Sequence, residues 1–491
     1  KKKGAPQILP QRKIFTLSVR KILKENNQNM NESDIFVPTR QVVNSEDVLN
    51  LKSFFTNEFD REPDFYVKVP GRVNIIGEHI DYCGYPVLPM AIQKNILLAV
   101  ASSEDGILQL KNAQSTIYKP FKCSIDSFKI EHPDGKGPEW YNYFLCGVRG
   151  ALEEIQANGE CKPKGMVVAI CGNIPPASGL SSSSALVSAA CLAVIQANGQ
   201  PLQKQLLATI SATSERHIGT QGGGMDQAIA FLARQGCAQY IEWNPLRATS
   251  VTLPPQTLFL IANSLTEANK AAKSDFNQRV VECRLGSRLL AKMSGRDDWK
   301  NILQFANLQD ILGYTLDEME SLADEYLSKE AYTRSELISV FQVDTAEFEE
   351  SLLTPNTRKS ELFHLRQRAL HVLQEAGRVF KFRQAAQIGD IEKMGELMKA
   401  SHESLCLLYE CSHQNLNDLV AAVGRAGASG RLTGAGWGGC IVALCDSIDQ
   451  CDGAMRELRK YFAQRPEAEG RNFDDLVFIT NSQRGAEVYL N

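Results

Sequence analysis

The most constraining feature of the sequence is a strand–loop–helix pattern between residues 165 and 197. The apolar run 165–171 is short enough for a buried strand, and the apolar run 186–197 is long enough for a buried helix. The loop between them contains two prolines, two glycines and four consecutive serines, Ser181–Ser184. Gly179 allows close approach of backbone, and the helix start leaves N–H groups without partners, so we expect an anion such as a phosphate to bind there. A serine-capped helix after an ordinary turn is the alternative.

Length and composition limit the classes of protein that this chain can belong to. With 491 residues it is too long for one core and fits two or three domains. It is 43% hydrophobic and 22% charged, as in soluble globular proteins, and it has no apolar run of the ~18 residues that a membrane span needs. Residues 1–45 contain nine Lys and Arg against three Asp and Glu, which leaves a net charge of −10 for the remainder. Such an acidic body argues against nucleic-acid binding as the main activity.

Cysteine usage indicates the compartment. The thirteen cysteines are odd in number, scattered, and never spaced as Cys-x-x-Cys. Reduced thiols in a cytoplasmic protein are therefore expected.

The chain divides into three regions by pattern. Residues 1–45 are expected to be a basic N-terminal extension that is disordered, with a basic amphipathic leader as the alternative. We expect a first domain over residues 46–250 and a second domain over residues 251–491 that carries a helical insertion.

A second dense stretch runs from Pro70 to Tyr82, after a predicted strand over residues 65–69 that should end at Pro70-Gly71. Its polar side chains are Arg72, Glu78, His79 and Asp81. Carboxylates and an imidazole gathered in four residues can pair with several hydroxyls at once, which favours a sugar site over a solvated charged turn.

A third stretch places Asp226 shortly after three glycines, Gly222–Gly224, and before an apolar run. The carboxylate should lie on tightly bent backbone at the edge of the core, and an ordinary acidic residue at a helix N-terminus is the alternative. Glu215 lies 11 residues earlier, so the two acids could converge on a polyphosphate and its cation.

A glycine-rich stretch over residues 431–444 matches the letters of a dinucleotide-binding motif at Gly434, Gly436 and Gly439. However, a strand follows it, whereas the dinucleotide-binding turn opens a helix. We expect instead a glycine turn between two strands that another loop approaches.

Together, the stretches 70–82, 172–185 and 432–439 resemble the three motifs of the GHMP kinase superfamily and, within it, the galactokinase family. The resemblance extends from about Val48 to the C-terminus. The residues 80–85, 222–226 and 262–270 are most similar to the N-acetylgalactosamine kinase branch of that family.

The resemblance implies a two-domain α/β (α+β) GHMP kinase fold with the active site in the interdomain cleft. It implies transfer of phosphate from ATP, with Mg²⁺, to the anomeric 1-hydroxyl of N-acetylgalactosamine and of galactose. The implied catalytic residues are Asp226 and Arg72, and the implied sugar-binding residues are Arg72, Glu78, His79, Asp81 and Asp226. The implied ATP-binding residues are Gly179, Ser181, Ser182, Ser183, Asn269, Lys270, Trp140 and Tyr143. The implied Mg²⁺ ligands are Ser183 and Glu215.

Other functions compatible with this resemblance are a galactokinase with galactose as its main substrate and a catalytically silent galactose and ATP sensor that acts through a protein partner. The complete serine run and the presence of Asp226 favour an enzyme. We expect a cytoplasmic monomer whose partners are a small-molecule sugar and ATP, with no nucleic acid and no membrane.

Overall fold

The computed structural model describes residues 32–131, 137–157, 159, 162–267 and 274–491. Within these ranges every helix is too short or too polar to cross a bilayer. The N-terminal extension expected over residues 1–45 lies outside the described residues up to position 31.

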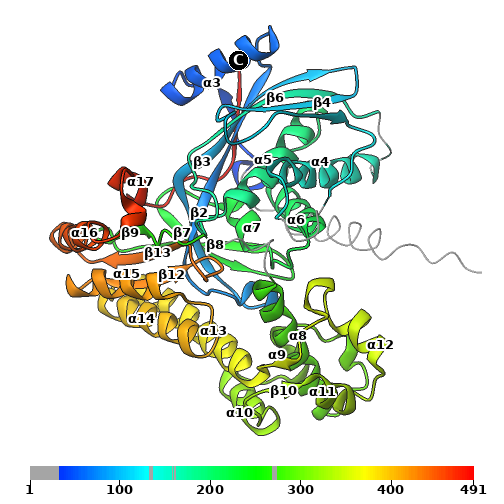
Figure 1. Cartoon of the computed structure of the whole chain (residues 1–491), viewed down its shortest axis with the longest axis vertical. Coiled ribbons are helices and arrows are strands. Elements are labelled where there is room, and N and C mark those ends of the chain that lie inside the picture. The colour runs from blue at the N-terminus through cyan, green and yellow to red at the C-terminus, as the bar shows by residue number, and fades with distance from the viewer. Residues whose placement is uncertain (1–31, 132–136, 158, 160–161, 268–273) are drawn as a thin grey trace, which may run out of the picture.

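A seven-stranded sheet forms the upper part of the molecule in Figure 1. Its strands, in spatial order, are β1 (Thr39–Gln41), β15 (Glu487–Leu490), β2 (Phe65–Ile76), β3 (Leu88–Ser103), β6 (Gly165–Gly172), β4 (Ile107–Asn112) and β5 (Phe121–Ser124). Most neighbours are antiparallel, but β1 pairs with β15 in parallel and β4 pairs with β6 in parallel. The sheet therefore joins residues from both ends of the sequence.

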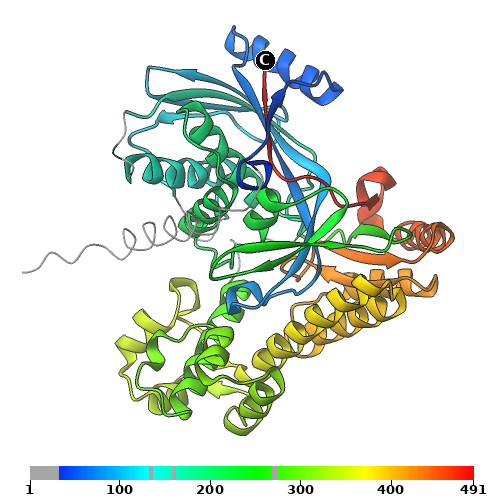
Figure 2. The same ribbon diagram turned by 180° about the vertical axis from the view of Figure 1, so that it is seen from behind.

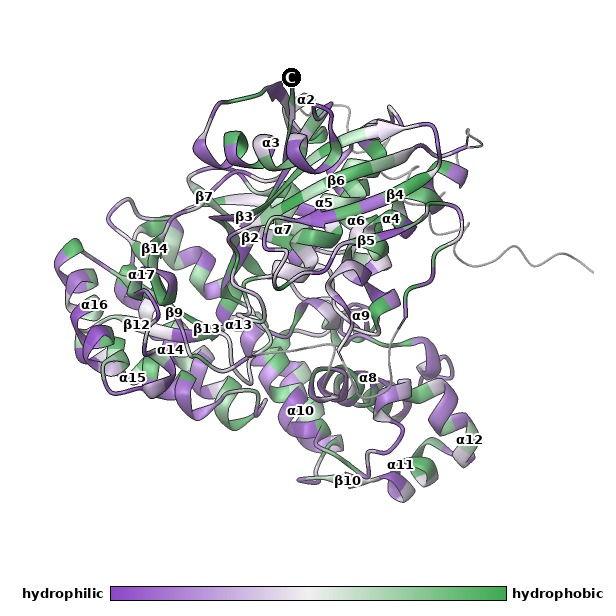
Figure 3. Cartoon of the chain, turned by 45° about the horizontal axis from the view of Figure 1, so that its top comes forward, coloured by the Kyte–Doolittle hydropathy of each residue, from purple (hydrophilic) through white to green (hydrophobic). Residues whose placement is uncertain are grey.

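Helices cover both faces of this sheet. Successive residues of each strand point to opposite faces, and in β2 and β3 both sets of side chains are largely apolar. Tyr66 and Leu97 pack with Phe55 of α3 (Glu46–Phe59), whereas Val67 and Leu98 pack into the main core on the other face. That other face carries α4 (Trp140–Ala157), α5 (Ser182–Ala197), α6 (Lys204–Glu215) and α7 (Met225–Leu232). Helix α5 is buried along almost its whole length, and Figure 3 shows the apolar character of the strands beside it.

A second sheet of four strands lies to one side of the first. Its order is β12 (Ser429–Thr433), β13 (Cys440–Cys445), β9 (Leu258–Asn263) and β14 (Val477–Thr480). The helices that pack on or beside it are α14 (Ile391–Leu407), α15 (Gln414–Arg425), α16 (Ile448–Phe462) and α17 (Phe473–Leu476). Strands β12 and β13 form a hairpin around the glycine-rich stretch, as predicted.

A mainly helical region occupies the opposite end of the molecule, as Figure 2 shows from behind. It comprises α8 (Asp275–Met293), α9 (Phe305–Leu312), α10 (Leu316–Tyr326), α11 (Arg334–Phe341), α12 (Thr345–Glu347), the first part of α13 (Leu365–Ile388) and the short strands β10 (Tyr332–Thr333) and β11 (Leu362–Phe363). Helix α13 runs from this region to the second sheet, where it packs against α14.

Strand β2 differs from its prediction, because it does not end at Pro70-Gly71. The register against β3 shifts between Pro70 and Arg72, and Arg72 N donates to Leu180 O at 3.2 Å. A bulge of this kind accommodates a proline, which has no N–H for the ladder. The strand therefore continues to Ile76 and carries Arg72 toward the serine loop.

The predicted region boundaries also differ from the structure. Residues 32–45 are not a free appendage, since they contain α2 (Glu32–Ile35) and β1, which pairs with β15. Position 250 lies inside β8 (Arg247–Thr252), which pairs with β7 (Cys237–Glu242), so the chain passes to the second sheet only after residue 252. Strand β15 then returns to the first sheet.

Candidate active site

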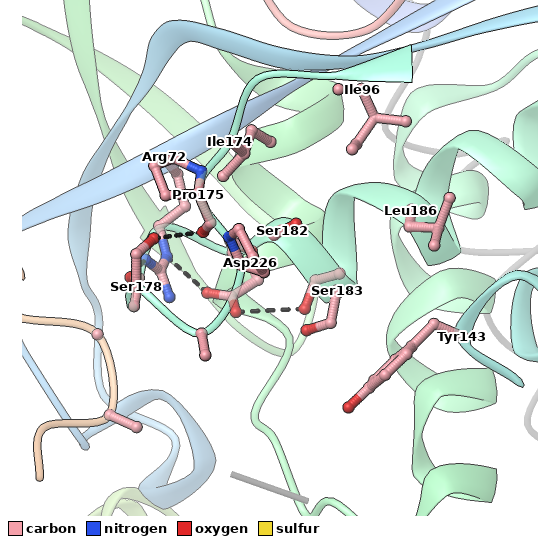
Figure 4. A pocket seen from close by; sticks show the side chains of 18 of the residues that line it. Arg72, Ile96, Tyr143, Ile174, Pro175, Ser178, Ser182, Ser183, Leu186 and Asp226 are labelled. Carbon is pink, nitrogen blue, oxygen red and sulfur yellow. Dashed lines mark hydrogen bonds and ion pairs between the residues drawn. The ribbon is translucent and has the colours of Figure 1, made fainter. Parts of the chain in front are cut away.

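A pocket of about 1100 Å³ lies where the N-termini of α5 and α7 meet the end of β2. Its lining comes from both sheets and their loops. The first sheet and its helices contribute Arg72, Ser183 and Asp226, and the second contributes Asn263 and Gly434. The pocket thus occupies the boundary between the two halves of the fold, and Figure 4 shows one side of it.

An ion pair between Arg72 and Asp226 stands at the base of this pocket. Arg72 Nε lies 2.6 Å from Asp226 Oδ1, and Arg72 Nη1 donates to Gly179 O at 2.5 Å. The Arg72 side chain is 2% exposed and that of Asp226 is 13% exposed, so the carboxylate is the more accessible of the two. Burial alone would lower the pKa of Arg72, but the Asp226 and Glu78 carboxylates outweigh burial and raise it. The guanidinium therefore stays charged and fixes the carboxylate in one place.

A serine hydroxyl joins Asp226 to a second acid. Ser184 Oγ lies 2.8 Å from Glu215 Oε2 and 3.3 Å from Asp226 Oδ2, and Gln227 Nε2 also donates to Glu215. The convergence of the two acids predicted from the sequence is therefore present. Ser184 was not among the predicted site residues, although it belongs to the serine run; Ser183, the predicted metal ligand, lines the pocket beside it.

The serine loop presents a helix N-terminus to the pocket. Helix α5 begins at Ser182, after Ser181 in the left-handed region with φ of 68°. Ser181 Oγ is buried and has no hydrogen-bond partner among the described residues. An unpartnered buried hydroxyl beside free helix N–H groups is a site that suits an anion.

Gly179 explains how the loop holds its shape. Its φ is 74°, and a Cβ built there would lie 2.8 Å from Thr433 O. Gly434 meets the same constraint, since a Cβ on it would lie 2.5 Å from Gly179 O. Two glycines thus let the serine loop and the β12–β13 turn pack backbone against backbone, which confirms the predicted approach of another loop.

Asp81, another of the predicted sugar-binding residues, also lines the pocket. It is partly exposed, and its Oδ2 accepts from Met225 N at 3.3 Å, at the start of the helix that carries Asp226. A Cβ on Gly223 would lie 2.5 Å from Asp81 Oδ2, whereas one on Gly222 would meet no described atom within 4 Å. Asp81 is thus seated against Gly223, within the same part of the pocket as Asp226.

Glu78 and His79 border the pocket but are held by the protein. Glu78 is 2% exposed, and its Oε2 lies 3.1 Å from Arg431 Nη2. His79 Nε2 lies 2.9 Å from Ala435 O, which can only accept, so this nitrogen carries the proton and Nδ1 accepts from Tyr82 Oη at 2.8 Å. Both ring nitrogens of His79 are therefore occupied within the fold.

The residues predicted to border the nucleotide lie at the other end of the pocket. Trp140 and Tyr143 come from the first turn of α4, and the Trp140 indole donates to Lys119 O at 3.0 Å. Burial raises the pKa of Tyr143, so its hydroxyl stays protonated. Asn269 and Lys270 lie outside the described residues. Sequence reasoning missed Lys94 and Tyr118, which also line the pocket but stand in stretches without a distinctive motif.

Family models match three segments of the chain. The galactokinase galactose-binding signature matches residues 53–102, the GHMP kinases N-terminal domain matches residues 142–234, and the GHMP kinases C-terminal model matches residues 382–464. The first segment contains Arg72 and Asp81, and the second contains the serine loop and Asp226.

Similar proteins span most of the chain. The galactokinase of Dictyostelium discoideum is 36% identical over 410 residues, which cover 78% of this chain and 81% of the relative. The galactokinase of Candida parapsilosis is 34% identical and covers 81% of this chain and 84% of its own length. The solved galactokinase of Lactococcus lactis, complexed with galactose, superposes with a TM-score of 0.68 at 23% identity and covers 90% of this chain and 100% of its own.

The likeness to the solved galactokinase confirms the two-domain fold. The identity to the two relatives, 36% and 34% over most of each chain, establishes the family. This chain belongs to the galactokinase family of the GHMP kinases.

Proposed function

We propose that this protein transfers the γ-phosphoryl group of ATP to the anomeric 1-hydroxyl of a galactose-type sugar. The observation that carries the proposal is the position of the Arg72–Asp226 ion pair, in one pocket with the N-terminus of α5. Phosphoryl transfer depends on alignment and on neutralisation of charge, for which a helix N-terminus and an arginine are suited. Asp226 accepts the proton of the sugar hydroxyl as that oxygen attacks phosphorus.

The site's oxygen ligands fit Mg²⁺, which ATP-dependent kinases use. Mg²⁺ prefers one or two carboxylates together with phosphate oxygens and water. Glu215 and Asp226 supply two carboxylates, and the Ser183 and Ser184 hydroxyls stand beside them. No group of three or more His, Cys, Asp or Glu in the described part of the chain is arranged to hold a metal by itself. When bound, the ion would neutralise phosphate charge.

We assign N-acetylgalactosamine to the substrates together with galactose. The relatives' names point to galactose, and the space beside Gly222, which lines the pocket, offers room for a larger 2-substituent. Asp81 is the acceptor for sugar hydroxyls. The enzyme is expected to act as a monomer in the cytoplasm.

The Asp226→Asn variant tests the proposed base. It keeps the shape of the side chain but removes its capacity to take a proton, so turnover should fall by about 10²-fold or more while ATP binding is retained. ADP release with galactose, N-acetylgalactosamine and glucose measures turnover, and calorimetric titration with ATP measures binding.

Asp449→Asn is the matched control, because Asp449 is exposed in the first turn of α16, the same helix position that Asp226 has in α7. Its turnover should equal that of the native protein. Near-normal turnover of Asp226→Asn would refute the assignment, and a native protein that binds galactose and ATP without releasing ADP would favour the sensor.

A further inference from the structure

A cluster of buried polar side chains stands behind the segment Gly77–Glu78, on the far side from the pocket. We name it the α13 cluster; its members are His371, Glu375 and Arg378 of α13, Ser401 of α14 and Arg431 of β12. His371, Glu375, Ser401 and Arg431 are all 0% exposed. Burying polar and charged groups lowers the stability of the fold unless they have hydrogen-bond or ion-pair partners. The partners of this cluster therefore indicate which part of the chain it holds in place.

Glu375 binds the backbone of the sugar-signature loop. Its Oε1 accepts from Gly77 N at 2.9 Å and from Glu78 N at 3.3 Å, and it also accepts from Ser401 Oγ at 2.7 Å. Its Oε2 lies 2.6 Å from Arg378 Nε. One carboxylate of the second half of the fold thus holds two successive amides of the first half.

His371 and Arg431, two neighbours of Glu375, also bind Glu78. His371 Nε2 donates to Glu78 O at 3.2 Å, and Arg431 Nη2 lies 3.1 Å from the Glu78 carboxylate. Arg431 Nη1 donates to Asn74 O at 2.8 Å. The N–H, the carbonyl and the side chain of Glu78 are all held from across the domain boundary.

The loop also rests directly on α13. Gly77 has a φ of 103°, and a Cβ built on it would lie 2.9 Å from Val379 of α13. The positive φ and the contact with Val379 leave little room for another backbone conformation at Gly77. From Gly77 the chain continues through His79 to Asp81, which lines the pocket. The position of Asp81 therefore depends on how Gly77 and Glu78 are held.

We propose that Glu375 is a positioning residue for the sugar, which sets the place of Asp81 by fixing the backbone of Gly77 and Glu78 without touching the substrate. The inference rests on the proposed function, since it assigns Asp81 to the sugar. The same contacts make sugar recognition a property of both halves of the fold. The positive Arg378 and Arg431 overcome burial and lower the pKa of Glu375 to about 2, so the carboxylate remains a charged acceptor.

The Glu375→Gln variant tests this inference. It keeps one acceptor oxygen, for which the charged Arg378 competes. The Gly77 and Glu78 amides, which share Oε1 in the native protein, then face an NH₂ group that cannot accept. We expect the KM and the calorimetric Kd for galactose to rise by about 10-fold or more, while the KM for ATP stays within about twofold.

Glu282→Gln provides a matched control. Glu282 is 1% exposed, accepts from His364 N at 3.0 Å and lies 2.9 Å from Arg368 of the same helix α13. Like Glu375, it is a buried carboxylate that binds an arginine and a backbone amide, but it holds no residue of the sugar loop. Its KM and Kd for galactose and its KM for ATP should equal those of the native protein, even if its thermal midpoint falls as far as that of Glu375→Gln.

The outcomes separate the inference from the proposed function. An unchanged galactose Kd in folded Glu375→Gln, or equal effects on galactose and ATP, overturns the inference while native sugar turnover still upholds the function. If Glu375→Gln does not fold, Ser401→Ala removes the hydroxyl that donates to Glu375 and accepts from Arg431 Nε at 3.1 Å. A galactose Kd that rises in this milder variant supports the positioning role, and an unchanged Kd contradicts it.

Discussion

Gly222 and Gly223 are neighbours in the sequence, but they meet different surroundings. Of the two, only Gly223 has described atoms within 4 Å of the place that a Cβ would take, and the nearest, Tyr82 N, lies at 2.4 Å. Gly223 therefore packs closely against the segment that carries Asp81, whereas Gly222 faces open space in the pocket.

We expect Gly223→Ala to reduce sugar turnover by about 10-fold or more, because the methyl group displaces Asp81 and the start of α7. Gly222→Ala should leave turnover nearly unchanged, because open space receives its methyl group. Steady-state kinetics with galactose and N-acetylgalactosamine measure both. Equal losses in the two variants would contradict this account.

At the residue scale, the sequence predicts site residues best where a charged side chain contrasts with its neighbours. Arg72 and Asp226 stand out as polar residues in apolar or glycine-rich surroundings, and Glu215 is selected by its spacing from Asp226. All three line the pocket. Ser184 is missed because four identical hydroxyls give no reason to choose among them; the helix direction selects the one that faces Glu215. Glu78 and Asp81 look equivalent in sequence, and only Arg431, more than 350 residues away, distinguishes them.

At the scale of elements, the apolar run 186–197 predicts the end of α5, but the helix begins earlier, at Ser182 within the serine run. The prediction is wrong at Pro70-Gly71, where proline usually ends a strand. Here the bulge takes up the missing N–H, and Gly71 fits against Leu180 O, which a Cβ would approach to 2.9 Å. The partner that makes this possible is remote in sequence, so no local pattern could reveal it.

The contact of α13 with the sugar loop also predicts a pH dependence of stability. Burial lowers the pKa of His371 to about 4, and burial likewise lowers the pKa of His402 on α14 to about 4. Between pH 6.5 and pH 4 these two histidines bind protons in the unfolded chain but stay neutral in the native protein. The free energy of unfolding therefore falls as pH falls through this window. The full effect for His371 is about 3 kcal/mol.

Thermal midpoints measured from about pH 7.5 to about pH 4.5 check this expectation, with native protein and His371→Gln compared at each pH. The glutamine cannot take up a proton, so the variant should lose less stability across the window than the native protein does. Parallel curves for the two proteins would show that His371 does not titrate in this way.

At the scale of the whole molecule, the sequence predicts two domains but not how they interlock. Strand β15 lies between β1 and β2, and its pairing places Val488 opposite both Thr39 and Val67. The strand is short, and its partners are remote in the sequence. Long-range pairing of this kind leaves no periodic signal, which is why the local pattern at residues 32–45 predicts an appendage where the structure has a strand of the sheet.

Removal of residues 487–491 should therefore destabilise the first sheet. It exposes the edge of β2 and leaves β1 without its partner, and we expect a fall in thermal midpoint of several degrees or more. Differential scanning calorimetry measures the fall, and removal of Asn491 alone is the control. If the longer truncation melts like the control, β15 contributes little to the sheet.

The position of β15 has a consequence for biosynthesis. While a ribosome makes this protein, strand β2 emerges long before β15, which will cover its edge, and β1 has no partner strand until β15 is made. During that interval an unpaired strand edge is open to other nascent chains. The yield of native protein should thus depend on how quickly elongation delivers the far end of the polypeptide, and on chaperones that shield the edge until then.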